Sequence, residues 1–146
     1  MLFEETIAGH VIELIWRIYF FTRKGIDHNL KELDLTYPQF GTLVALGKKE
    51  NISQKNLAEA LGTDTTNVMV VCDSLEKKGL IERTAHPTDR RVNLIVRTAK
   101  GKRLTSNAMK LMEDYVGRIT GRLEEKELRA VLPTLKKLYE SLMGDE

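Results

Sequence analysis

The chain has 146 residues, a length that suits one domain or a compact domain with an added oligomerisation element. Its 42% hydrophobic and 30% charged residues exclude an intrinsically disordered chain. Its net charge of +2 is too small to indicate a nucleic-acid partner by itself.

The N-terminal region predicts two helices. Residues 5–24 repeat apolar side chains at helical spacing, with a second apolar flank that must also be covered. Residues 37–47 predict the next helix, because Thr36 suits its N-cap and Pro38 its first turn.

No feature of the sequence predicts a membrane or an exported protein. The longest apolar cluster, residues 11–21, is interrupted by charges and is too short to span a bilayer. The opening residues form no secretory leader, and a single cysteine excludes an internal disulfide. We therefore expect a cytoplasmic protein.

The middle of the chain carries the excess positive charge. Residues 53–103 contain ten Lys/Arg and six Asp/Glu, a net charge of +4, whereas residues 1–52 and 104–146 each carry −1. A phosphate-binding surface would have this charge, although on charge alone an uneven solvated surface explains it equally well.

The same middle region predicts two short helices in succession. Ser53 caps the first helix and Gly62 ends it, after which Asp64 caps a second helix that runs to about Lys78. Gly79 ends the second helix.

A β-hairpin follows the second helix directly. Residues 80–84 and 92–96 are short β-type stretches, separated by a charged segment with turn signals at Pro87 and Asp89. Two helices joined at a glycine-containing turn and followed by a hairpin predict a winged helix-turn-helix.

From Ala99 the helical period returns and continues to residue 143, with one break at residues 123–127 and a bend expected at Pro133. The predicted fold is mainly α with a small β-hairpin wing. We divide it into an N-terminal dimerisation helix (1–35), a winged helix-turn-helix DNA-binding domain (36–98) and C-terminal dimerisation helices (99–146).

The helix at residues 64–78 has the pattern of a recognition helix, which reads bases in the major groove through its exposed N-terminal residues. Its buried face is predicted to hold Val68, Val71, Cys72 and Leu75, opposite Thr66, Val70, Asp73 and Lys77. An ordinary surface helix is the alternative, but an exposed Val-Met-Val run is costly on a plain surface.

The wing is the second predicted DNA contact. Arg90 and Arg91 suit phosphates or a narrow minor groove, while Asp89, and Asp73 of the recognition helix, are expected to hold arginines in place. In the helix at residues 64–78, the Asn67 amide could pair with adenine, and Met69 and Val70 could pack on thymine methyl groups. The complete set of candidate DNA contacts is Ser53, Gln54, Lys55, Asp64, Thr65, Thr66, Asn67, Met69, Val70, Lys77, Thr88, Asp89, Arg90 and Arg91.

The sequence resembles the MarR family of winged-helix regulators. The resemblance lies in four segments in the family's order and spacing: QKNLAEALG at 54–62, DSLEKKGLI at 73–81, PTDRR at 87–91 and TAKG at 98–101. It implies a triangular dimer with interleaved terminal helices and one winged helix in each subunit.

Three positions depart from the family pattern. Val70 stands where the family often has a basic or polar residue, so base contacts are expected to be fewer and more apolar. Arg97 stands where the last strand usually has leucine, so the end of this strand is expected to be more exposed. Cys72 lies in the recognition helix, whereas the redox-sensing branch carries its reactive cysteine in the first helix; peroxide sensing by that route is not expected.

The leucine-rich stripes of the terminal helices predict a homodimer, because one core of this size is not expected to cover them. The resemblance further implies a repressor of a pseudo-palindromic operator that a small aromatic or phenolic ligand releases. Aromatic and cationic residues are the candidates for binding such a ligand: Trp16, Arg17, Tyr19, Phe20, Tyr37 and Tyr115. Each of them, taken singly, is better explained as a residue that packs in the core or in the dimer interface.

Two other classes of protein remain as alternatives. An enzyme is disfavoured because His10, His28, His86 and the single cysteine have no metal-site spacing, and the chain has no phosphate-binding glycine loop or nucleophile elbow. We expect no metal and no cofactor. An interaction or ligand-sensing module that has lost DNA binding fits the modest net charge, although the Asp-Arg-Arg wing argues against it.

Overall fold

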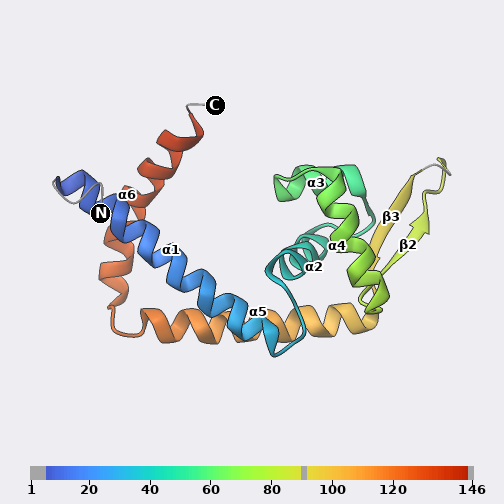
Figure 1. Cartoon of the computed structure of the whole chain (residues 1–146), viewed down its shortest axis with the longest axis horizontal. Helices are drawn as coiled ribbons and strands as arrows, with labels where there is room; N and C mark the ends of the chain where they lie inside the picture. The colour runs from blue at the N-terminus through green and yellow to red at the C-terminus, as the bar shows by residue number, and fades with distance from the viewer. Residues whose placement is uncertain (1–5, 90–91, 145–146) are drawn as a thin grey trace. The chain divides into compact units, whose positions relative to one another are not determined.

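The computed structural model describes residues 6–89 and 92–144 (Figure 1). The chain forms two compact units, the first ending at Met112 and the second beginning at Glu113. The elements in chain order are α1 (Ile7–Lys31), α2 (Tyr37–Lys48), β1 (Ile52–Ser53), α3 (Gln54–Leu61), α4 (Thr65–Lys77), β2 (Ile81–Ala85), β3 (Asn93–Arg97), α5 (Ala99–Thr120) and α6 (Glu125–Met143).

The first helix extends further than the sequence pattern predicts. We expected it to end at residue 24, but α1 continues to Lys31. Gly25 lies inside the helix, where the side chain of Asn29 donates a hydrogen bond to its carbonyl oxygen at 2.7 Å. Leu30 is fully buried. Packing of this last turn on the core therefore outweighs the low helix propensity of glycine.

Helix α2 begins as predicted. The Thr36 hydroxyl accepts a hydrogen bond from the backbone N–H of Gln39, and the Gln39 side chain accepts one from the backbone N–H of Thr36. This reciprocal pair is a capping box, and Pro38 occupies the first turn, where its missing N–H leaves no bond unmade.

The caps of the helix-turn-helix are also confirmed. Ser53 and Asp64 accept hydrogen bonds from backbone N–H groups in the first turns of α3 and α4. Gly62 ends α3 with φ +62°, a left-handed conformation that favours glycine. Helices α2, α3 and α4 pack on one another, and α4 contacts β2 (Figure 1).

The wing has one more strand than the predicted hairpin. Strands β2 and β3 are antiparallel and lie one residue further along the chain than expected, with Ile81 opposite Arg97. The two-residue strand β1 pairs with the other edge of β3, Ile52 opposite Ile95, so the sheet order is β1-β3-β2. A strand of two residues has no periodicity from which sequence analysis can detect it.

The core of the first unit lies between the helices and the sheet. Leu43 and Leu46 come from α2, and Leu57 comes from α3. All three side chains are fully buried, as is Ile95 of the central strand. These long-range apolar contacts hold the winged helix together.

The expectation that the end of β3 is exposed is wrong. The Arg97 side chain is only 14% exposed, and its guanidinium lies 3.1 Å from Glu50 Oε1. Lys102 joins the same carboxylate at 3.2 Å. Hydrogen bonds from Arg97 and then from Lys102 hold the pKa of Glu50 below its usual range. The family pattern has leucine at this position. The ion pair with Glu50 allows Arg97 to occupy the same half-buried position.

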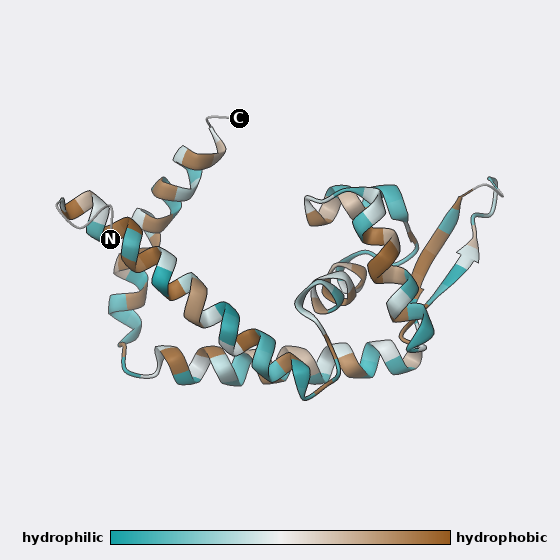
Figure 2. Cartoon of the chain, viewed as in Figure 1, coloured by the Kyte–Doolittle hydropathy of each residue, from teal (hydrophilic) through white to brown (hydrophobic). Residues whose placement is uncertain are grey.

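The second unit contains the end of α5 and all of α6. Glu124 and Glu127 form a capping box at the start of α6, and Pro133 lies inside this helix. Within the described part of the unit, α6 contains no buried residue. Figure 2 shows apolar residues recurring along both α1 and α6. In the described residues no helix is both long and apolar enough to cross a membrane.

Candidate nucleic-acid interface

Helix α4 has the two faces that the sequence predicts. Val68, Cys72 and Leu75 are buried, and Val71, which was predicted to be buried with them, is half-buried. Thr66, Asp73 and Lys77 are exposed on the opposite side. On the exposed side, the apolar side chains of Met69 and Val70 are 47% and 62% accessible to solvent. Apolar side chains exposed next to polar ones indicate a surface that makes contacts. Thr65 lies in the same exposed first turn.

Asn67 is held at the start of α4. Its side-chain amide donates to Asp64 Oδ2 at 2.6 Å and, more weakly, to Thr63 Oγ1 at 3.4 Å. An adenine contact needs one amide N–H and the amide oxygen. A contact with adenine would therefore cost Asn67 only the weaker bond to Thr63, while the bond to Asp64 would keep the amide oriented.

An arginine that is absent from the predicted set joins the wing to α4. Arg83 of β2 places Nη2 at 2.5 Å from Asp73 Oδ1, and Nη1 contacts Glu76 Oε2. Asp73 was expected to hold an arginine, and Arg83 is that residue. The ion pairs compensate two carboxylates of α4, which would otherwise repel a phosphate near this helix.

The tip of the wing is organised around His86. Its Nδ1 accepts hydrogen bonds from the backbone N–H groups of Thr88 and Asp89, both at 3.3 Å. The backbone N–H of His86 donates to the carbonyl of Val92 at 3.0 Å. The predicted contacts Thr88 and Asp89 are therefore exposed on a structured turn. Arg90 and Arg91 lie outside the described residues.

The predicted contacts of α3 lie at its start. Ser53 uses its hydroxyl as the N-cap, Gln54 is half-buried, and Lys55 is exposed. Lys55 is thus available to a phosphate, whereas Ser53 and Gln54 contribute mainly to the beginning of the helix.

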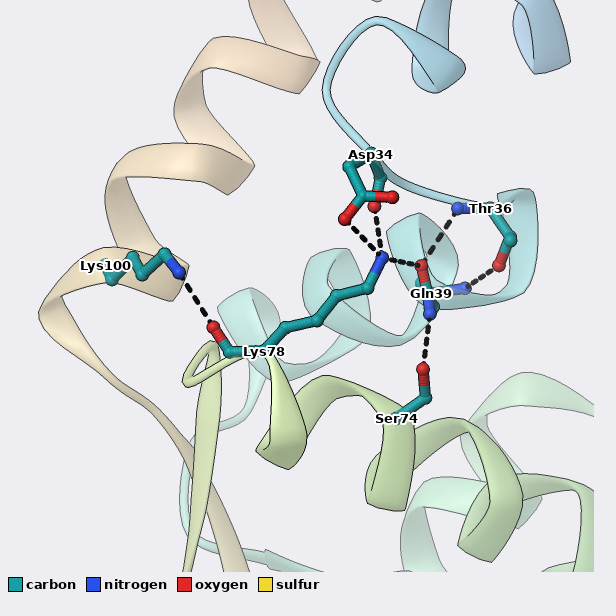
Figure 3. A network of polar contacts seen from close by, with 6 residues as sticks. All are labelled: Asp34, Thr36, Gln39, Ser74, Lys78 and Lys100. Atoms are coloured by element: carbon teal, nitrogen blue, oxygen red, sulfur yellow. Dashed lines mark hydrogen bonds and ion pairs between the residues drawn. The ribbon is translucent and has the colours of Figure 1, made fainter.

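A polar network at the other end of α4 was missed by sequence analysis (Figure 3). Lys78 Nζ contacts the Asp34 backbone carbonyl, its carboxylate at 3.1 Å and Gln39 Oε1 at 3.4 Å. Gln39 Nε2 donates in turn to Ser74 Oγ at 2.8 Å, and Lys100 Nζ donates to the Lys78 carbonyl at 2.8 Å. Through these bonds the C-terminal end of α4 contacts the loop between α1 and α2 and the start of α5.

The candidate ligand residues lie on three helices, α1, α2 and α5. Trp16 and Phe20 stack on each other at 5.5 Å on α1, and Arg17 pairs with the buried Glu13 on the same helix. Tyr37 lies under the Arg23 guanidinium, with 3.8 Å between the guanidinium carbon and the ring centroid, and lines a hollow of about 410 Å³. Tyr19 is exposed on α1, and Tyr115 belongs to the second unit.

Comparison with known proteins identifies the fold. Residues 33–92 match the model of the MarR family. The structure is similar to that of CouR bound to a 23-mer DNA duplex, at 27% identity and a TM-score of 0.76, over 92% of this chain and 93% of CouR. A cysteine-to-serine mutant of MarR from E. coli, complexed with operator DNA, gives 25% and 0.77 over 92% and 99%. CouR from Rhodococcus jostii RHA1 bound to p-coumaroyl-CoA gives 24% and 0.75 over 92% and 95%.

Proposed function

We propose that this chain, which has the winged-helix fold of the MarR-family transcriptional regulators, is a sequence-specific double-stranded DNA-binding regulator. The observation that carries the proposal is the exposed face of α4, where Met69 and Val70 lie exposed beside the polar side chains of its first turn. Structures of similar proteins bound to DNA support the same function. No catalytic role is proposed.

The proposed contacts follow from the positions of the side chains. The first turn of α4, with Thr65, Thr66 and Asn67, reads base edges, and Met69 and Val70 pack on thymine methyl groups. Lys55 and Lys77, which are exposed, contact phosphates and contribute affinity without sequence preference. Arg90 and Arg91 of the wing add phosphate or minor-groove contacts.

We propose that the protein works as a homodimer. Large apolar side chains are exposed on α1, including Ile12, Trp16 and Phe20, and on α6, including Leu132 and Leu135. A second copy would cover such surfaces across a two-fold axis. Two recognition helices about 34–36 Å apart would then match a pseudo-palindromic operator.

Regulation is proposed as repression in the cytoplasm, relieved by a small aromatic ligand. The complex of CouR with p-coumaroyl-CoA supports ligand control. A ligand that binds one spacing of the two winged helices better than another shifts the population away from the form that binds DNA. The alternative is an interaction module on the same fold without DNA binding.

Fluorescence anisotropy tests the function directly. The DNA immediately upstream of the coding sequence is compared with a scrambled duplex at two salt concentrations. Tight, salt-sensitive binding of two chains per site, with preference for the upstream duplex, supports a dimeric autoregulator. The double variant Arg90→Ala/Arg91→Ala should reduce the slope of log affinity against log salt by about one per lost phosphate contact. An unchanged slope in this variant contradicts the wing contact.

The matched control removes two arginines from the second unit. Arg118→Ala/Arg122→Ala changes the net charge by the same amount, and both residues are exposed outside the winged helix. If this control lowers the salt slope as much as the wing variant, the effect is one of net charge and the wing contact is wrong.

A further inference from the structure

Gln39 of α2 is buried against α4 and uses both ends of its side-chain amide (Figure 3). Oε1 accepts a hydrogen bond from the backbone N–H of Thr36 at 3.0 Å, which belongs to the capping box of α2, and one from Lys78 Nζ at 3.4 Å. Nε2 donates to Ser74 Oγ of α4 at 2.8 Å. A capping box needs only the side-chain oxygen, so the bond from Nε2 serves the contact between the two helices.

The bond to Ser74 fixes the rotation of α4 about its own axis. Ser74 lies two turns after Asn67, and two turns of about 3.6 residues bring these side chains to within about 20° of one another around the helix. An amide N–H that is buried without an acceptor is costly. A rotation of α4 that separates Ser74 from Gln39 therefore carries this cost, and the same rotation would turn Asn67 away from its present direction.

Lys78, the residue that ends α4, is held by three oxygen atoms. Its Nζ contacts the Asp34 carbonyl oxygen, the Asp34 carboxylate at 3.1 Å and Gln39 Oε1 at 3.4 Å, which gives one acceptor to each of the three ammonium hydrogens. Its own carbonyl accepts a hydrogen bond from Lys100 Nζ of α5 at 2.8 Å. The end of α4 is thus bonded to the loop after α1, to α2 and to α5.

Asp34 has a backbone conformation in which glycine is less strained. Its φ of +53° is left-handed, and it follows α1 at a point where the backbone N–H of Leu35 donates to the Leu30 carbonyl at 3.0 Å. Glycine is the usual residue at such a helix end. The Asp34 carboxylate is 91% exposed, so its ion pair with Lys78 adds little stability. What the aspartate supplies beyond a glycine is a fixed position for Lys78.

A small tilt at this end of α4 has a large effect at the other end. The first turn, with the proposed base contacts Thr66 and Asn67, lies about 12 residues and therefore about 18 Å from Lys78. A tilt of about 5° around Lys78 would move that turn by about 1.6 Å. Hydrogen bonds to base edges need donor–acceptor distances of about 2.7–3.2 Å, so such a shift breaks them. Long lysine side chains can still reach phosphates after the same shift.

We propose that Gln39 and Lys78 are positioning residues that determine the sequence preference of the protein without touching DNA. The inference rests on the proposed function, in which the first turn of α4 reads bases and lysines such as Lys55 contact phosphates. Without the bonds of Gln39 and Lys78, α4 loses its fixed rotation and tilt. The preferred duplex then loses its advantage, while binding through phosphates, which is independent of sequence, is retained.

The decisive variant is Lys78→Met, because it leaves the capping box of α2 intact. The full wild-type chain first selects a preferred duplex from a random pool, and anisotropy gives the Kd for this duplex and for its scrambled sequence at two salt concentrations. In Lys78→Met the Kd for the selected duplex should rise at least tenfold, and the Kd for the scrambled duplex less than threefold, with an unchanged salt slope. An equal rise for both duplexes with a reduced slope would make Lys78 a phosphate contact and overturn the proposal.

Two further changes separate position from charge and from the fold. Lys110→Met removes the same charge from an exposed residue of α5, and a loss of preference in this control would overturn the proposal. Gln39→Met removes both polar ends of the amide and should abolish most of the preference. Gln39→Glu keeps acceptors for the same three partners and should retain it. Equal losses in the two Gln39 variants would contradict the role of these bonds.

Residual dipolar couplings of the backbone N–H groups test the position of α4 in the free chain. In Lys78→Met the orientation of α4 relative to α2 should change by about 5° or more, enough to move the first turn away from base edges. An unchanged orientation overturns the proposal whatever the DNA affinities are. If the wild-type chain selects no sequence, the proposed function fails and the positioning role fails with it. A wild-type preference that Lys78→Met and Gln39→Met both retain overturns only the positioning role.

Discussion

Arg83 of β2 places its guanidinium between two carboxylates of the recognition helix, with Nη2 2.5 Å from Asp73 Oδ1 and Nη1 in contact with Glu76 Oε2. The arginine side chain is 17% exposed, whereas the two carboxylates are half exposed. The pairs therefore contribute little to stability and much to the electrostatic character of the exposed face of α4, the proposed DNA-binding surface.

Replacing Arg83 by glutamine should weaken DNA binding about five- to tenfold at low salt, because Asp73 and Glu76 then repel phosphate. Adding Asp73→Asn and Glu76→Gln to this variant should restore most of the affinity. Anisotropy titrations at two salt concentrations measure both effects. If the triple variant binds DNA no better than the single variant, Arg83 acts through the fold and not through charge compensation.

Cys72 should react slowly with a disulfide reagent in the folded protein. It is fully buried, and burial raises the pKa of its thiol from 9.0 to about 11, with only partial opposition from the Arg83 charge. Labelling should become fast only when the chain is unfolded by denaturant. Rapid labelling under native conditions contradicts the buried position and would reopen redox control.

The same thiol predicts a pH dependence of stability. Because the pKa of the thiol is raised in the folded state, the thiol ionises at lower pH in the unfolded chain than in the folded one. The contribution of the neutral thiol to the free energy of unfolding is therefore complete below pH 9 and is lost as the pH rises toward 11. The loss amounts to at most about 3 kcal/mol of unfolding free energy. Denaturant titrations from pH 8 to 11 should show a steeper decline for wild type than for Cys72→Ala. Parallel declines would exclude the thiol as their source.

Gly101→Ala should destabilise the first unit by about 2–4 kcal/mol, because the new Cβ would lie 1.9 Å from the backbone carbonyl oxygen of Leu80. Backbone, unlike the end of a flexible side chain, moves only with the elements around it. Gly117→Ala is the matched control, and its open surroundings predict an unchanged or slightly higher melting temperature. Equal melting temperatures for the two variants would contradict the close approach of α5 to Leu80.

Leu135→Glu should convert the proposed dimer into monomers of 16.7 kDa, because it places a charge in the exposed apolar stripe of α6. DNA affinity should fall about 100-fold or more, since a monomer has lost the effective concentration of its second winged helix. Lys136→Glu, on an exposed neighbouring residue, should leave the mass and the affinity nearly unchanged. Sedimentation equilibrium distinguishes the outcomes, and an unchanged mass for Leu135→Glu would place the dimer interface elsewhere.

Local signals explain what was predictable from the sequence. The capping residues Thr36, Ser53 and Asp64 act on N–H groups three residues away, and the two faces of α4 follow from the helical period. Signals of this short range are sufficient to predict the order of helices and hairpin and the family that this order resembles.

Contacts between distant segments explain what was missed. Glu50 lies 47 residues from Arg97, and Lys78 lies 39 residues from Gln39. Neither pair leaves a periodic or local signal, and the pairing of Glu50 with Arg97 reversed the predicted exposure of the strand end. The candidate DNA contacts of α4 lie on its exposed face, but their role in binding DNA stays a prediction.

Strand β1 has a consequence for any attempt to exchange wings between related regulators. Ser53 pairs with Leu94 in the sheet and also caps α3, so one residue belongs both to the wing and to the helix-turn-helix. A chimera that replaces only residues 81–97 would keep Ile52 and Ser53. These two residues would then have to pair with a central strand from another protein. Such grafts should fold only when residues 52–53 are exchanged together with the wing. The three strands and the start of α3 therefore have to be transferred as one structural unit.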